Sequence, residues 1–290
     1  MLKRTLTALL LIPPVVYLIG WSPKWLFLLA LVAAVVLALR EYFALCRGMG
    51  YKTLSWMGYV AGTVLCVAQM PPARWHFHPV VFFIVALLLL IPSLAMGTCT
   101  DLRDYLVTTS VTLFGILYIG LSLSCLIPIR FELHIIGGNR LAGGWVQPVE
   151  GPELILLLFL VIWAGDICAY IVGRSMGRIP FFVRISPRKT WEGALAGLGG
   201  SLLAAWAFEH WFWKTGDMKA VILIAAWVAV AGQAGDLVES AIKRGANQKD
   251  SGTLLPGHGG FLDRIDSLLF AAPALWLAMS ATAGMIPKLA

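Results

Sequence analysis

The sequence predicts an all-α polytopic integral membrane protein with about nine transmembrane helices and a cytoplasmic amino terminus. Hydrophobic residues make up 59% of the 290 residues, charged residues only 13%, and the mean hydropathy is +0.83. This composition excludes an ordinary soluble globular protein. The apolar stretches are roughly 20 residues long, which suits a spanning helix and is too long for a barrel strand. Because backbone groups in hydrocarbon need internal partners, each stretch is predicted to be helical.

Nine apolar windows are the candidate spans, and they cover residues 5–21, 25–43, 54–70, 79–96, 105–127, 153–173, 191–213, 219–238 and 267–286. An odd number of spans places the two termini on opposite sides of the membrane. Fifteen of the 22 Lys and Arg residues then fall on the side of the amino terminus. Positively charged loops stay in the cytoplasm, so this side is predicted to be cytosolic. The loops after the sixth and eighth windows hold nine of the fifteen.

Several other classes of protein are disfavoured. The net charge of +7 comes from basic residues in short loops, without the interleaved aromatic residues of a nucleic-acid surface, so no nucleic-acid partner is expected. The five cysteines are scattered and form no CxxC pair, which argues against disulfides and zinc. Lys3 and Arg4 precede an apolar run, but Pro13-Pro14 interrupts it and no small-x-small cleavage site follows. We interpret this run as a retained first helix.

Residues 235–267 carry the densest group of charged side chains. If the eighth span continues as a helix, five polar residues recur at three- and four-residue steps along one side of it, namely Asp236, Glu239, Ser240, Lys243 and Arg244. Asp263 and Asp266 lie three residues apart at the start of the ninth span and are expected to point the same way. A charge at membrane depth costs ~2.5–3.5 kcal/mol, so the group needs partners or a polar cavity. An interfacial network of salt bridges is one solution. The other is Mg²⁺ held by Asp236 and Asp263 together with substrate phosphates.

Two further segments have features of an anion-binding site. The glycines of Pro256 through Gly260 permit close backbone approach and could direct N–H groups at phosphate oxygens, although such a turn alone is usually only a turn. In the segment 186–193, Ser186 is expected to cap a helix whose amino terminus, with Arg188 and Lys189, favours anions. The alternative for this segment is an ordinary capped helix.

Asp166 lies inside the sixth predicted span, and an acid at that depth is a functional-site hypothesis by default. Together with Asp236 it could form a proton relay, so a transporter or proton-coupled channel is one alternative class of protein. A transporter of that kind is expected to contain inverted repeats, and the sequence shows none.

The chain resembles the phosphatidate cytidylyltransferase (CDP-diacylglycerol synthase) family. The motif residues are Ser240, Lys243-Arg244, Lys249-Asp250, Pro256 through Gly260, and Asp263-Arg264-Ile265-Asp266. The segments 186–193 and 166–170 also match, so the recognisable region runs from about 160 to 270. In the amino-terminal half, only Arg40-Glu41-Tyr42 weakly matches a feature of the family's sequences. We therefore expect a scaffold of transmembrane helices over residues 1–152 and a catalytic region over 153–290.

The resemblance implies that the protein transfers CMP from CTP to phosphatidate, giving CDP-diacylglycerol and pyrophosphate. It also implies one or two Mg²⁺ ions, with a monovalent cation as an additional option, a homodimer, and a bacterial inner membrane with the active site facing the cytosol. The implied metal ligands are Asp236 and Asp263. The implied nucleotide-binding residues are Ser186, Arg188, Lys189, Thr190, Lys249, His258, Gly259 and Gly260. The implied catalytic residues are Asp166, Lys243, Arg244, Asp250, Arg264 and Asp266. A related enzyme that activates another lipid phosphate would share these residues.

Overall fold

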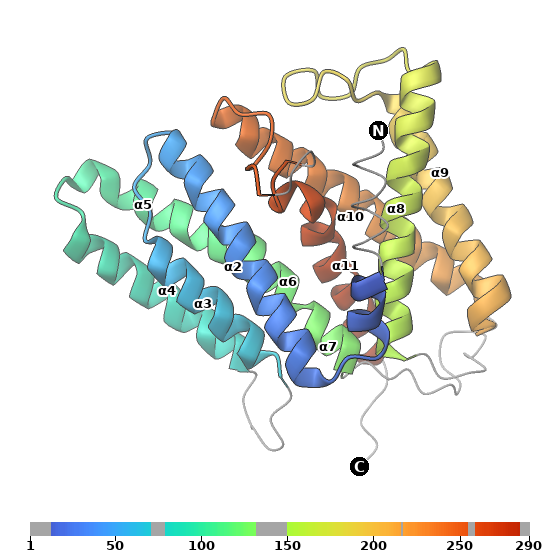
Figure 1. The fold of residues 1–290 in the computed structure, drawn as a ribbon, viewed down its shortest axis with the longest axis horizontal. Coiled ribbons are helices and arrows are strands. Elements are labelled where there is room, and N and C mark those ends of the chain that lie inside the picture. Colours follow the sequence, from blue (N-terminus) through green and yellow to red (C-terminus); the bar gives the residue numbers. More distant parts are fainter. Residues whose placement is uncertain (1–12, 71–78, 132–149, 216, 255–258, 285–290) are drawn as a thin grey trace. The chain divides into compact units, whose positions relative to one another are not determined.

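The computed structural model of the chain describes residues 13–70, 79–131, 150–215, 217–254 and 259–284 (Figure 1). These residues are almost entirely helical. An isolated β-bridge pairs Pro180 with Thr190, and no strand occurs among the described residues. The all-α prediction is confirmed for this part of the chain.

After a helical segment at 13–20, the described chain forms a series of helices. The main helices are α2 (Lys24–Gly48), α3 (Ser55–Ala68), α4 (Pro79–Thr98), α5 (Leu102–Gly115), α8 (Gly151–Met176), α9 (Trp191–Phe208), α10 (Met218–Gly245) and α11 (Asp266–Gly284). Shorter helical elements are η1 (Ile116–Leu121), α6 (Ser122–Ser124), α7 (Leu126–Phe131), η2 (Glu209–Trp213) and η3 (Leu262–Arg264). The elements η1 and η2 are π-helical, and η3 is a 3₁₀ turn.

Five helical stretches are long and apolar enough to cross a membrane. They are Lys24–Gly48, Val80–Thr98, Leu102–Phe131, Gly151–Met176 and Met218–Gly245. The apolar helices Ser55–Ala68 and Asp266–Ala281 are shorter. The chain is thus a helical membrane protein. The count of nine spans and the cytoplasmic amino terminus stay predictions, and most of the 5–21 window lies outside the described residues.

The helices pack into two compact units that alternate along the chain. One contains Met1–Pro128 and Ala241–Ile265, and the other contains Ile129–Ser240 and Asp266–Ala290. Helix α10 passes from the second unit into the first at Ala241. As a result, much of the motif segment packs with the amino-terminal helices. The expected boundary at residue 152 concerns function and not packing, and it stays a prediction.

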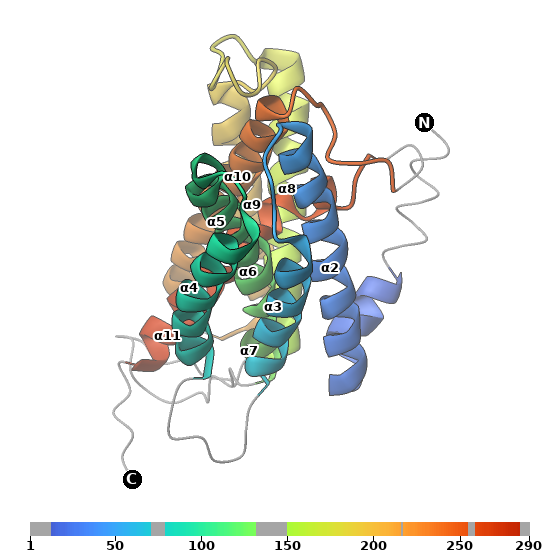
Figure 2. The ribbon, with the colours of Figure 1, turned by 90° about the vertical axis from the view of Figure 1, so that its left-hand side faces the viewer.

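In the first unit, α2 lies against α3, and Figure 2 shows the two helices side by side. The core of this unit contains Met57, Leu65, Ile91 and Ile116, which are buried. The hydroxyl of Tyr42 on α2 donates a hydrogen bond to the carbonyl oxygen of Val111, at 3.0 Å. This packing fixes the carboxy-terminal half of α2, which carries Glu41.

In the second unit, α8 and α9 pack through small side chains at four-residue steps. These are Gly165, Ala169 and Gly173 on α8, Gly177 directly after it, and Gly193, Gly197, Ser201 and Ala205 on α9. A Cβ atom added to Gly197 would lie 3.1 Å from the carbonyl oxygen of Gly165. Small residues allow such close backbone approach between membrane helices. The contact therefore fixes where α9 begins relative to the end of α8.

Replacing Gly197 with Leu should destabilise the protein by about 1–3 kcal/mol, because the added side chain would overpack the contact between α8 and α9. Gly199 lies on the same helix with nothing within 4 Å of an added Cβ, so Gly199→Leu is the matched control. Thermal unfolding in detergent measures both variants. Equal melting temperatures for the two would contradict this account of the packing.

Candidate active site

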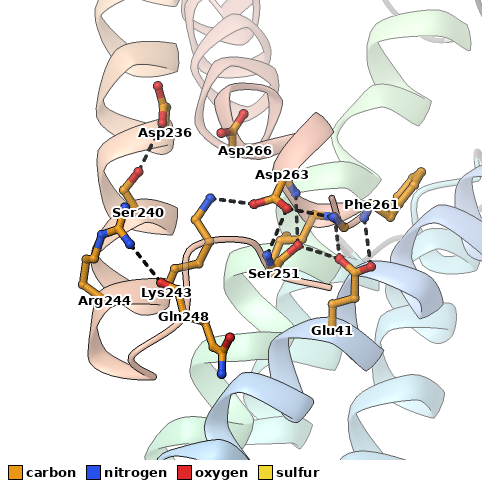
Figure 3. A network of polar contacts seen from close by, with 12 residues as sticks. Glu41, Asp236, Ser240, Lys243, Arg244, Gln248, Ser251, Phe261, Asp263 and Asp266 are labelled. Carbon is orange, nitrogen blue, oxygen red and sulfur yellow. Dashed lines mark hydrogen bonds and ion pairs between the residues drawn. The ribbon is translucent and has the colours of Figure 1, made fainter. Parts of the chain in front are cut away.

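Three of the predicted acidic residues, Asp166, Asp236 and Asp263, lie in two polar clusters, one in each unit. The Asp263 network, in the first unit, comprises Glu41, Lys243, Ser251, Gly260, Phe261, Leu262 and Asp263 (Figure 3). The Asp236 cluster, in the second unit, comprises Asp166, Lys189, Asp236 and Ser240.

Asp263 is held at both carboxylate oxygens. Its Oδ1 accepts a hydrogen bond from the Lys243 ammonium at 2.6 Å, and the two side chains are largely buried. Its Oδ2 accepts from the backbone N–H groups of Ser251 at 2.9 Å and Gly260 at 2.8 Å. The carboxylate thus connects α10 to both ends of the segment 251–263.

The charge state of Asp263 follows from these contacts. Burial alone would raise the pKa of the Asp263 carboxyl, but Lys243 and the N–H groups of Ser251 and Gly260 outweigh it and hold the pKa below its usual value. Asp263 is therefore ionised at neutral pH. Its ion pair stabilises the fold above the ordinary Asp pKa of about 3.9, and this stabilisation is lost as pH falls through the lower folded pKa.

Glu41 is a member of the Asp263 network to which sequence reasoning assigned no role. It comes from α2 and is only 8% exposed. Its Oε1 accepts from the N–H of Phe261 at 2.9 Å, and its Oε2 accepts from the N–H of Leu262 and the hydroxyl of Ser251, both at 2.8 Å. The Arg40-Glu41-Tyr42 tripeptide was the available signal, but it predicted no contact with residues more than 200 positions away.

The glycines of the motif are explained by these carboxylates. Gly259 has φ +79°, which disfavours other residues, and an added Cβ would lie 2.8 Å from Asp263 Oδ2. A Cβ on Gly260 would overlap the Ser251 hydroxyl. The Gly260 N–H, predicted to face a phosphate, donates to Asp263 instead. Nucleotide binding by Gly259 and Gly260 stays a prediction, and His258 lies outside the described residues.

The Asp236 cluster joins α10 to the turn before α9. The Lys189 ammonium forms an ion pair with Oδ2 of Asp236, and the Ser240 hydroxyl donates to Oδ1 at 3.4 Å. Asp166 on α8 is close enough to interact with the charges of both Lys189 and Asp236. Helix α10 continues to Gly245, so the expected extension of the eighth span is confirmed.

The start of α9 corrects one sequence prediction. Thr190, not Ser186, caps the helix, because its hydroxyl accepts from the N–H of Gly193 at 3.2 Å. Ser186 lies in the preceding turn, where its carbonyl oxygen accepts from the N–H of Lys189 at 3.1 Å. Arg188 in that turn is exposed. The actual cap therefore lies four positions after the expected one.

The acids at the start of the ninth span differ from expectation. Asp263 lies in η3 and Asp266 begins α11, with the non-helical Ile265 (φ −122°) between them. The two residues do not belong to one continuous helix, so the orientation argument from their spacing is wrong.

Among the other predicted site residues, Arg244 donates to the carbonyl oxygen of Gln248 at 3.1 Å. Three more predicted site residues are exposed, namely Lys249, Asp250 and Arg264.

The acidic residues have the donor chemistry that Mg²⁺ requires. The described ranges contain no group of three His, Cys, Asp or Glu side chains that could hold a metal ion. However, Mg²⁺ uses few protein carboxylates and completes its shell with water and phosphate oxygens. A carboxylate has about four lone-pair positions. Asp236 accepts two hydrogen bonds and Asp263 three, so both retain acceptor capacity.

A cleft of about 390 Å³ lies beside the Asp263 network, within the first unit. Glu41, Ser251 and Gly252 form one part of its lining, and the exposed Arg40 supplies a positive charge. Leu37 and Leu254 supply apolar surface. Such a lining suits a molecule that has both an anionic and an apolar part.

Comparisons with known proteins agree on one family. The profile of the cytidylyltransferase family matches residues 2–282. A phosphatidate cytidylyltransferase of Synechocystis sp. is 34% identical over 270 residues, which cover 87% of each chain. The chloroplastic phosphatidate cytidylyltransferase 5 of Arabidopsis thaliana is 34% identical over 85% of this chain and 64% of its own length. The Bacillus subtilis phosphatidate cytidylyltransferase is 43% identical over 45% of this chain and 48% of its own.

Replacing Lys243 with Met should destabilise the protein by about 3–5 kcal/mol, because Asp263 would be left buried without its cation. The pKa of Asp263 should also rise, so that destabilisation by acid begins at a higher pH than in the parent protein. The exposed pair of Lys52 and Asp104, 2.8 Å apart, provides the control, and Lys52→Met should have little effect. Thermal unfolding across pH 3–7 measures both variants, and parallel curves would refute the prediction.

Proposed function

This chain belongs to the cytidylyltransferase family, and on that premise we propose that it transfers CMP from CTP to phosphatidate, giving CDP-diacylglycerol and pyrophosphate for phospholipid biosynthesis. The match over residues 2–282 carries the proposal. Two pairs of an acid and a lysine, each with one member on the long apolar helix α10, support it.

In the proposed reaction, a phosphate oxygen of the lipid attacks the α-phosphorus of CTP. A new P–O bond forms there, and the bond from the α-phosphorus to the bridging oxygen of the β-phosphate breaks, so that pyrophosphate leaves. Such phosphoryl chemistry depends on alignment and on neutralising charged oxygens rather than on a covalent enzyme intermediate. Lys243 and Lys189 are held in place by their acids, and the exposed Arg244, Lys249 and Arg264 add positive charge for the phosphates.

The acids have supporting roles in this proposal. Asp236 and Asp263 are the proposed Mg²⁺ ligands, and the bound ion would neutralise phosphate charge. Asp166, Asp250 and Asp266 would orient basic residues or bind the ribose. Ser186, Arg188 and Thr190, near the start of α9, would contact the nucleotide, because a helix amino terminus favours anions.

The proposed setting is a bacterial inner membrane, with the site on the cytosolic face where CTP is available. The excess of Lys and Arg in the loops after α8 and α10 supports that orientation. A homodimer is the proposed assembly, by resemblance to the family.

Membranes or proteoliposomes containing the protein should convert labelled CTP and phosphatidate to CDP-diacylglycerol. Asp263→Asn should abolish the conversion, because Lys243 and two N–H groups would lose their charged acceptor. Asp104→Asn, at the exposed ion pair, should retain it. Parallel reactions with other lipid phosphates test the substrate, and equal or better turnover of another lipid would contradict phosphatidate as the acceptor. If the protein forms no product with any lipid phosphate, the proposed transferase activity is contradicted.

Chelation of divalent ions should abolish CDP-diacylglycerol formation, and added Mg²⁺ should restore it. Asp236→Asn should raise the Mg²⁺ concentration that gives half-maximal activity, because one anionic ligand is lost. Titrating Mg²⁺ against initial rate measures this shift, with Asp104→Asn as the control. Unchanged activity after complete chelation would contradict the requirement for a metal.

A further inference from the structure

We propose that Glu41 is a positioning residue for the transferase site, acting through Ser251 to fix Asp263 and its partner Lys243. This inference rests on the proposed function. It gives the amino-terminal helix α2 a direct part in arranging the motif segment.

The first step of the argument is the set of groups that Glu41 binds. Its carboxylate accepts hydrogen bonds from the N–H groups of Phe261 and Leu262 and from the hydroxyl of Ser251. All three donors belong to the segment 251–263, yet Glu41 is separated from them by more than 200 residues. Glu41 therefore ties both ends of this segment to one point on α2.

The second step is the link from Glu41 to Asp263. The Ser251 hydroxyl donates to Glu41 and accepts from the backbone N–H of Asp263 at 3.3 Å, while the Ser251 N–H donates to Asp263 Oδ2. The position of Ser251 thus influences both the backbone and the side chain of Asp263. Asp263 in turn holds the Lys243 ammonium, which completes a continuous path from Glu41.

The third step concerns the chemical character of Glu41. Burying a carboxylate is costly unless donors surround it, and a buried apolar residue would pack here without that cost. The donors to Glu41 are neutral N–H and O–H groups, and they occupy three of about four acceptor positions. Although Glu41 lines the cleft described above, it is only 8% exposed and its carboxylate is engaged by these donors. These properties suit a residue that positions others, not one that reacts.

Glu41→Gln is the sharpest test, since it keeps the side-chain size. The amide NH₂ would face N–H or O–H donors in place of one carboxylate oxygen, so the segment 251–263 must shift. We expect kcat to fall roughly 10–100-fold and the Mg²⁺ concentration needed for activity to rise. Losses of this size are usual when a residue that hydrogen-bonds to a metal ligand is replaced. The KM values for CTP and phosphatidate should change much less. Asp104→Asn is the matched control, because it makes the same acid-to-amide change at an exposed ion pair.

A second measurement separates positioning from general stability. Amide hydrogen exchange should quicken in segments 251–254 and 259–263 of Glu41→Gln while α8 and α9 stay protected. Ser251→Ala should lower kcat similarly, and the double variant should lose little more than either single change, because both act along one path. If Glu41→Gln does not fold, the kinetic and hydrogen-exchange measurements on Ser251→Ala still test the inference.

Three results would overturn the inference: parental kcat in a folded Glu41→Gln protein, uniform loss of protection throughout the chain, or additive effects of Glu41→Gln and Ser251→Ala. Failure of the proposed function is distinct, because the unmodified protein would then form no CDP-diacylglycerol. In that case hydrogen exchange in the two variants still tests whether Glu41 holds the segment. Unchanged exchange in that segment would refute the link.

Discussion

The need to satisfy a buried carboxylate governs the organisation of the first unit. Glu41 accepts three hydrogen bonds from the segment 251–263, and Asp263 accepts two more from the same segment besides its lysine. These contacts require main chain to approach carboxylate oxygens closely. An added Cβ on Gly252 would lie 2.7 Å from Glu41 Oε1, which explains a glycine outside the recognised motif. Part of the sequence pattern thus reflects internal hydrogen bonding in addition to any role in binding nucleotide.

A different constraint operates in the second unit, where small residues bring α8 and α9 together. Gly193 and Gly197 place the start of α9 against α8, and Gln233 on α10 donates to the carbonyl oxygen of Ala194 at 3.0 Å. Three helices are thereby aligned around the turn that carries Lys189. The ion pair of Lys189 and Asp236 therefore depends on backbone packing and not only on the attraction of its charges.

Sequence reasoning predicted the features that depend on local periodicity and composition. The helical class, the membrane character and the continuation of α10 to Gly245 all follow from apolar runs and three- and four-residue spacing. The family followed from a long motif. The cap of α9 was misplaced because Ser and Thr are both common helix caps, so the sequence does not distinguish Ser186 from Thr190. The bridge between Pro180 and Thr190, after which the helix begins, cannot be recognised from the neighbouring sequence. Spacing likewise could not reveal the break at Ile265.

The role of Glu41 was beyond the reach of such reasoning. Its partners lie 210 to 221 positions away, so no window of sequence contains both sides of the contact. A single acid near the end of an apolar helix has many explanations, including an interfacial position. Only the folded chain distinguishes among them, because the identity of the donors decides the role.

The alternation of the two packing units along the chain has a consequence for dissection of the protein. Residues 241–265 belong with the amino-terminal helices, although they carry much of the motif that identifies the family. A fragment beginning at residue 153 would retain that motif and lose the helix whose acid binds it. Truncation at the boundary expected at residue 152 would therefore separate the motif from the helix that binds it. Co-expression of complementary halves is the better strategy for studying either one.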